Sequence, residues 1–149
     1  MNRWQPYVTA ATVVERAGCF LMVEESHGRH DTLFSQPAGH LEPGERIRDG
    51  ALREVREETA WQAGITDYLG LYVYNAPDGK TFHSHGFFGM ALAHLGNELD
   101  PAILAVHWMT LEEIEQLERE GRLRSPLVMR RIRDALAGRF YPMDVVHER

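Results

Sequence analysis

The sequence is poor in the features that mark secreted and membrane-spanning proteins. Cys19 is the one cysteine among 149 residues, so no internal disulfide can form. No apolar stretch approaches the roughly 20 residues that cross a bilayer. Residues 1–14 contain a short apolar run broken by threonines, which is unlike a signal peptide. We therefore expect a cytoplasmic protein with no membrane contact, and we expect Cys19, in the apolar run 19–23, to be buried.

Positive charge is also in short supply. Lys and Arg number 16 against 22 Asp and Glu, which gives a formal net charge of -6. Proteins that bind duplexes or long RNA depend on basic patches, so this balance argues against a nucleic-acid partner. A small anionic substrate remains compatible with the charge, because a metal ion can bring a phosphate to an acidic pocket.

Apolar residues and turn signals together indicate one domain over residues 1–149. The chain is 44% hydrophobic and 26% charged, which is ordinary for a globular protein. Alternating β-rich runs predict strands over residues 8–14, 19–25, 68–76, 85–95 and 102–109. Caps and glycine stops predict helices over residues 47–62, 110–120 and 125–138, and loops over 26–36 and 37–45. The expected fold class is α/β, with helices covering the faces of a sheet.

The stretch ALREVREETAW, residues 51–61, crowds three glutamates together. On a helix turning about 100° per residue, Glu54, Glu57 and Glu58 fall in one arc beside an apolar stripe. Arg53 and Glu57 form an i,i+4 pair, which is typical of a solvated face and is worth about 0.3–0.5 kcal/mol. Glu54 and Glu58 have the same spacing and repel each other by a similar amount. Such crowding favours a compensating cation, and carboxylate oxygens suit Mg²⁺ or Mn²⁺.

Residues upstream extend this cluster into a longer pattern. Gly39, Glu45 and Arg53 precede the glutamates with the spacing G-x5-E-x7-R-E-U-x-E-E, in which Val55 is the bulky aliphatic residue U. Seven fixed positions within twenty residues are far more specific than a lone glycine motif. The pattern resembles the Nudix box, and the order of elements around it is similar to that of the Nudix hydrolase superfamily. The resemblance implies a Nudix-type α/β/α sandwich, with a mixed β-sheet flanked by helices.

The resemblance also implies roles for the box residues. The implied metal ligands are the carboxylates of Glu54, Glu57 and Glu58 and the carbonyl of Gly39. Glu54 is the first choice for the base that takes a proton from water, Arg53 orients a box carboxylate, and Glu45 braces the loop. The implied activity is divalent-metal-dependent hydrolysis of a diphosphate-containing small molecule, with Mg²⁺ expected and Mn²⁺ as an alternative. Some members use a glutamate outside the box, for which Glu98 and Asp100 are candidates.

Short segments outside the box resemble the NudJ-type phosphatases within the superfamily. They are VTAATVV, FLMVEE, QPAGHLE, APDGKT, LRSPLV and RFYPMDVV. That group is associated with nucleoside di- and triphosphates and with hydroxymethylpyrimidine pyrophosphate, so the resemblance suggests release of inorganic phosphate. Two alternatives stay open. An RNA 5′-pyrophosphohydrolase would need a basic track, and a non-catalytic binding module would be expected to lose the box glutamates that this chain retains.

Four residues outside the metal set are further candidates for substrate binding: Arg29, His40, Lys80 and Glu98. For Arg29, Lys80 and Glu98 the alternative is an ordinary solvated residue, and for His40 it is a structural role beside the box. His83 and His85 alternate on an expected strand edge, where solvent-facing side chains are favoured over a metal site. The chain could act as a monomer or a homodimer.

Two positions in the expected helix depart from the simplest pattern. Ala60 stands where the box normally has glycine, and we expect it to be tolerated because this position supplies no ligand. Gly50 lies inside the helix, where glycine costs up to about 1 kcal/mol, and it would allow a close approach of backbone.

Overall fold

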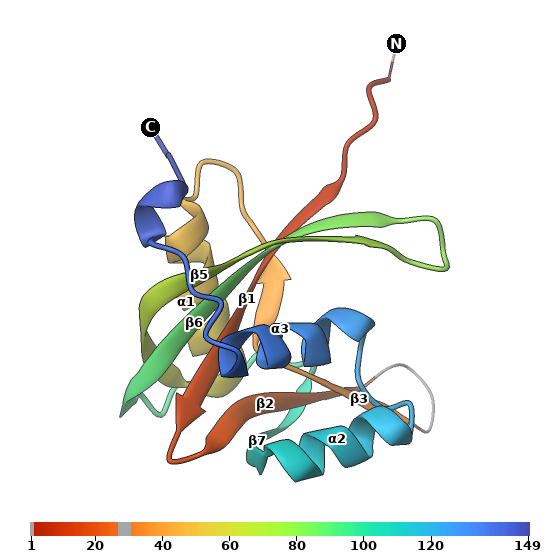
Figure 1. The fold of residues 1–149 in the computed structure, drawn as a ribbon, viewed down its shortest axis with the longest axis vertical. Helices are drawn as coiled ribbons and strands as arrows, with labels where there is room; N and C mark the ends of the chain where they lie inside the picture. The colour runs from red at the N-terminus through yellow and green to blue at the C-terminus, as the bar shows by residue number, and fades with distance from the viewer. Residues whose placement is uncertain (1, 27–30) are drawn as a thin grey trace.

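A computed structural model describes residues 2–26 and 31–149 (Figure 1). The strands are β1 (Tyr7–Arg16), β2 (Cys19–Ser26), β3 (Thr32–Ser35), β4 (Ala38–His40), β5 (Trp61–Asn75), β6 (Thr81–His94) and β7 (Ile103–Thr110). The helices are α1 (Ile47–Thr59), α2 (Leu111–Arg119), α3 (Pro126–Leu136) and the short 3-10 helix η1 (Met143–Val145).

The strands form one mixed sheet. Its order is β3-β2-β1-β6-β5, while β7 also pairs with β2 and β4 also pairs with β1. The central pair, β1 and β6, is parallel, and the other pairs are antiparallel. The expected mixed sheet is therefore confirmed.

Helices cover both faces of this sheet. Successive side chains of a strand point to opposite faces, so Val13 and Val14 enter different cores. Val13 packs in the cluster that contains Ile114 of α2 and Ile132 of α3, whereas Val14 packs with Val55 of α1. Figure 1 shows α2 and α3 together in front of the sheet. The expected α/β/α sandwich is confirmed.

Local sequence placed several element boundaries wrongly. The predicted loops 26–36 and 37–45 contain β3 and β4, which are only four and three residues long and show no periodic apolar pattern. Both strands exist because β2 and β1 offer them backbone partners. The helix ends at Thr59 instead of residue 62, and β5 follows at once, since pairing with β6 overrides the weak local signal.

Two side-chain expectations are also corrected. Cys19 is half-buried instead of buried, because it is the first residue of β2, opposite Arg16 beside the turn. His83 and His85 lie on β6 between β1 and β5, so they are not on a strand edge. His85 Nδ1 lies 2.9 Å from the Tyr68 hydroxyl, and burial lowers the pKa of His85. In the described residues, no helix has the length and apolarity needed to cross a membrane.

Candidate active site

The strand β4 and the helix α1 bring the box residues together. A Cβ atom on Gly39 would overlap the Glu54 carboxylate, so the absence of a side chain at Gly39 lets that carboxylate lie against the strand. The preceding residue, Ala38, donates its backbone N–H to Glu58 Oε1 at 2.9 Å. Two consecutive residues of β4 therefore contact two carboxylates that lie one helical turn apart.

The pairing of β4 with β1 decides which backbone oxygens face these carboxylates. Two bonds of 3.1 Å fix the pattern, from Leu41 N–H to the Val8 carbonyl and from Thr12 N–H to the Pro37 carbonyl. They make Gly39 and Ala10, which lie opposite each other, the hydrogen-bonded pair. The Gly39 carbonyl therefore points toward β1, while the carbonyls of Ala38 and His40 point toward the open edge.

Arg53 links the loop after β4 to the acidic face of α1. Its Nε donates to Glu45 Oε2 at 2.6 Å, and its second terminal nitrogen donates to Glu45 Oε1 at 3.0 Å. The other terminal nitrogen donates to Glu54 at 2.9 Å and to Glu57 at 3.1 Å. Arg53 also donates to the His40 carbonyl at 3.1 Å. These bonds raise the pKa of Arg53 and lower that of Glu45.

A second glycine makes room for this arrangement. A Cβ on Gly50 would overlap the Leu41 side chain and would lie 2.7 Å from Glu45 Oε1. The groups that approach Gly50 are side chains and not the backbone expected from the sequence, and they seat the loop against the first turns of α1.

The carboxylates outnumber the positive charges that face them. The pKa of Glu58 is raised to about 8, chiefly by burial and also by the nearby Glu25 and Glu54, while the Ala38 N–H and Arg124 act in the opposite direction. Burial also raises the pKa of Glu54, in spite of its bond to Arg53. The cluster is thus short of positive charge where its two most buried carboxyl groups lie.

Sequence reasoning missed Glu25. This residue of β2 is buried, pairs with Arg124 at 3.2 Å, and lies close enough to Glu58 to raise its pKa. Strand alternation could have found it, because Glu25 shares a face of β2 with the buried Leu21 and Val23.

Sequence reasoning also missed Arg131 of α3. Its guanidinium is buried and donates to Gln36 Oε1 at 3.2 Å and to Ser84 Oγ at 2.8 Å. Gln36 precedes β4 by two residues, so this bond links α3 to the segment that leads into the strand. Burial lowers the pKa of Arg131 to about 10. Nothing local distinguishes Arg131 from the exposed Arg130 beside it in the sequence.

The other candidates are placed differently. His40 and Lys80 both lie beside Tyr7. The centroids of the His40 and Tyr7 rings are 5.8 Å apart, and the Lys80 ammonium is 5.7 Å from the centroid of the Tyr7 ring. Asp100 donates its N–H to the Glu57 carbonyl at 2.8 Å, which brings the segment after β6 against α1. Glu98 in that segment is exposed. Arg29 lies outside the described residues.

The carboxylate oxygens of Glu54, Glu57 and Glu58 are of the type that binds a hard divalent cation, although the three side chains do not converge on one point. Within residues 2–26 and 31–149, no three His, Cys, Asp or Glu side chains are placed to hold a metal as they stand. Glu54 and Glu57 turn toward Arg53, and Glu58 turns toward Ala38. Oxygen donors on one helix face, with too little positive charge beside them, are what Mg²⁺ or Mn²⁺ requires.

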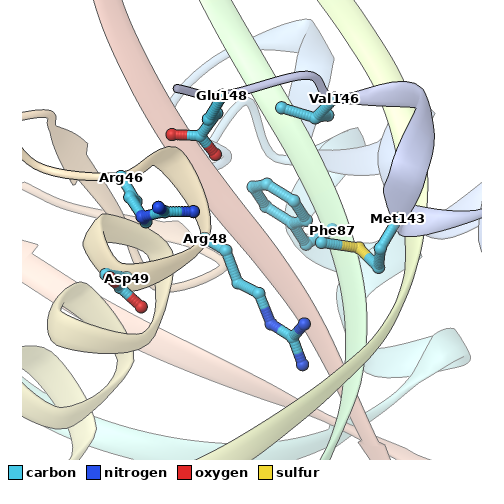
Figure 2. A pocket seen from close by; sticks show the side chains of 7 residues that line it. All are labelled: Arg46, Arg48, Asp49, Phe87, Met143, Val146 and Glu148. Atoms are coloured by element: carbon cyan, nitrogen blue, oxygen red, sulfur yellow. The ribbon is translucent and has the colours of Figure 1, made fainter.

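Two hollows flank the carboxylates at opposite ends of α1. One, of about 400 Å³, lies at the N-terminal end and is lined by Arg46, Arg48, Asp49, Phe87, Met143, Val146 and Glu148 (Figure 2). The other, of about 420 Å³, lies at the C-terminal end and is lined by Thr59, Ala60, Trp61, His94, Gly96, Asn97, Leu99, Val106 and Trp108. Neither lining includes a box glutamate, so the carboxylates, and not the cavities, locate the candidate site.

Comparison with known proteins decides the family. The NUDIX domain model matches residues 4–131. The chain belongs to the Nudix family. Phosphatase NudJ of Escherichia coli (strain K12) is 37% identical over 146 residues, which cover 96% of this chain and 92% of NudJ, and the Shigella flexneri protein matches equally. These matches confirm the resemblance drawn from the box and from the shorter segments.

Solved structures agree with this assignment. A NUDIX hydrolase from Nitrosomonas europaea is 35% identical, superposes with a TM-score of 0.92, and is matched over 97% of this chain and 98% of its own. The NUDIX domain of Shewanella oneidensis NrtR, solved with ADP ribose, shares the fold at a TM-score of 0.73 and 16% identity, over 91% and 89% of the two chains. This chain is thus a Nudix hydrolase of the NudJ phosphatase type, an enzyme that acts on diphosphate-containing compounds.

Proposed function

We propose that this enzyme hydrolyses the diphosphate of a small organic molecule with Mg²⁺ as its cofactor and releases inorganic phosphate. The observation that carries the proposal is the contact of Glu54 and Glu58 with two consecutive residues of β4, with Glu57 held beside them through Arg53. The substrates are a nucleoside di- or triphosphate or hydroxymethylpyrimidine pyrophosphate, by similarity to the NudJ group.

Glu54, Glu57 and Glu58 would hold the cation together with one backbone carbonyl. The family resemblance implied the Gly39 carbonyl, but the strand register favours Ala38, whose carbonyl shares the open edge with the N–H that reaches Glu58. A divalent ion there would offset the charge of the diphosphate and lower the pKa of a bound water. Gly39 then serves through its missing side chain, which admits Glu54.

The protein's own groups supply the remaining chemistry. Glu54 accepts the proton of the attacking water, a role that suits a carboxyl group whose pKa is raised by burial. The water oxygen bonds to phosphorus, and the bond from that phosphorus to the bridging oxygen breaks. Arg53 fixes the positions of Glu54 and Glu57 through charge-assisted hydrogen bonds, and Glu45 fixes Arg53.

Phosphate release from a panel of diphosphates tests the proposal. The panel contains hydroxymethylpyrimidine pyrophosphate, nucleoside di- and triphosphates, ADP-ribose and triphosphorylated RNA, each with Mg²⁺ and with EDTA. Glu57→Gln should lower kcat/KM at least about 100-fold, because it removes a charged ligand while keeping the side-chain shape. Glu115→Gln, on α2, is the matched control.

Separate assays for orthophosphate and pyrophosphate show which bond is cut. Equal turnover by the wild type and Glu57→Gln on every substrate would overturn the proposal, as would full activity in EDTA.

A further inference from the structure

Three aromatic rings gather on the face of the sheet opposite α1. Tyr7 of β1, His40 of β4 and Phe82 of β6 form this group, which we name the aromatic shelf. The ring centroids are 5.8 Å apart for Tyr7 and His40, 5.5 Å for Tyr7 and Phe82, and 6.4 Å for His40 and Phe82. Segments from three separate parts of the sequence thus build one aromatic surface.

The shelf begins where α3 stops covering the sheet. Ser84, which Arg131 of α3 contacts, lies two residues after Phe82 on the same face of β6. Tyr7 is 45% exposed, His40 is exposed and Phe82 is half-buried. In the described part of the chain, none of these rings belongs to a buried hydrophobic cluster.

A cation lies beside the shelf. The Lys80 ammonium is 5.7 Å from the centre of the Tyr7 ring, and it also pairs loosely with Asp78 at 3.7 Å. The shelf therefore offers flat aromatic faces, an imidazole and a phenol that can form hydrogen bonds, and a positive charge. A planar heterocycle that carries phosphate matches all of these groups.

The shelf and the metal-binding residues share the strand β4. Gly39 contacts Glu54 on one face of that strand, and the ring of His40, the next residue, lies on the other face. Their Cα atoms are only about 3.8 Å apart. The edge of β4 away from β1 carries the groups that Glu58 and Arg53 contact, namely the Ala38 N–H and the His40 carbonyl. A ligand held at this edge by its diphosphate reaches both sites.

We infer that the aromatic shelf binds the heteroaromatic group of the substrate by stacking, and that the Lys80 ammonium offsets the negative charge of the substrate's phosphate. This inference rests on the proposed function for the position of the diphosphate. It assigns specificity to Tyr7 and Phe82, which have no part in the chemical step. Stacking is tolerant of the ring's identity, so the shelf selects pyrimidine- or purine-type diphosphates over aliphatic ones and does not read a single base.

Substrate comparison tests the shelf. Tyr7→Leu and Phe82→Leu should each raise KM for hydroxymethylpyrimidine pyrophosphate about tenfold, the loss expected for one stacking contact, with kcat within about twofold. For dimethylallyl diphosphate, an aliphatic diphosphate, the kcat/KM of the same variants should stay within about twofold of the wild-type value. Tyr7→Phe keeps the ring and should restore KM. The matched control, Tyr141→Leu, removes a half-exposed tyrosine beside Tyr68, far along the sheet.

Equilibrium binding separates this inference from the proposed function. Calorimetric titration with a pyrimidine nucleoside diphosphate in Ca²⁺ should show about tenfold weaker binding to Tyr7→Leu than to the wild type. If that weakening occurs without any hydrolysis by the wild type, the shelf stands and the proposed function fails. If hydrolysis occurs but Tyr7→Leu and Phe82→Leu bind and turn over heteroaromatic substrates like the wild type, the shelf is overturned. Equal losses on aromatic and aliphatic substrates would also overturn it.

Discussion

Ala60 shows how a residue that carries no chemistry limits the helix that does. It adopts a left-handed conformation, with φ 61° and ψ 17°, and its N–H bonds to the Arg56 carbonyl at the end of α1. This geometry favours glycine, which explains the glycine of the Nudix box. Alanine favours a helix more than glycine does, but this preference has no effect at Ala60, because Ala60 lies just past the last helical residue.

Ala60→Gly should therefore raise the free energy of unfolding slightly, by about 0.5–1 kcal/mol. Relief of the left-handed strain, about 1–2 kcal/mol, exceeds the added entropy of glycine in the unfolded chain. Turnover and metal dependence should stay nearly unchanged, since Ala60 contacts no box carboxylate. Urea unfolding and steady-state kinetics check both parts. A stability loss, or a large loss of activity, would show that the alanine methyl supports the site.

At the scale of the element, α1 is capped by the far end of the chain. Its N-cap residue, Arg46, makes no side-chain cap, and the Ile47 N–H instead donates to Glu148 Oε2 at 2.9 Å. Figure 2 shows Glu148 beside Arg46 at this helix end. A carboxylate there satisfies a free N–H and interacts favourably with the helix dipole.

Glu148→Ala should lower the free energy of unfolding by about 1 kcal/mol, and Glu148→Gln by about half of that, because glutamine keeps an acceptor but loses the charge. The part due to charge should shrink as salt rises. Denaturant titrations at low and high salt measure both effects. Glu115→Ala is the control, at a glutamate of α2 that forms no ion pair within residues 2–26 and 31–149, and equal stabilities of the two alanine variants would contradict the cap.

At the scale of the whole molecule, the buried carboxyl group of Glu58 makes stability depend on pH. The pKa of Glu58 rises from 4.5 to about 8 on folding. The folded protein therefore keeps a proton that the unfolded chain loses. The stabilisation from this group is complete below pH 4.5 and is lost as pH rises through about 8.

Without metal, wild-type stability should fall between pH 5 and 8, with a contribution from Glu58 of up to about 1.4 kcal/mol per pH unit. Glu58→Gln should show a flatter dependence. Added Mg²⁺ should stabilise the wild type more at pH 8.5 than at pH 6, since the ligand must be ionised. Urea unfolding in EDTA and in Mg²⁺ across this range gives the slopes, and parallel slopes for wild type and variant would contradict the assignment.

The box positions were predictable because their spacing is a property of the chain alone. Glu54 and Glu58 fall on one helix face by periodicity, and Arg53 reaches Glu57 at i,i+4. The structure also contains a capping box of Thr110 and Glu113 at the start of α2, and this signal is equally local in the sequence. The short strands β3 and β4 were not predictable, because their hydrogen bonds come from partners distant in sequence.

The sequence by itself determined the α/β class, the acidic helix face and the family, because each depends on residue type at fixed spacing. Only the tertiary structure decided that Gly39 makes room for Glu54, that the Ala38 carbonyl faces the open edge, and that Glu25 lies near Glu58. It alone brought Tyr7, His40 and Phe82 together from three strands. The physical reason is that strand register and packing between layers are set by contacts between distant segments, which no local pattern records.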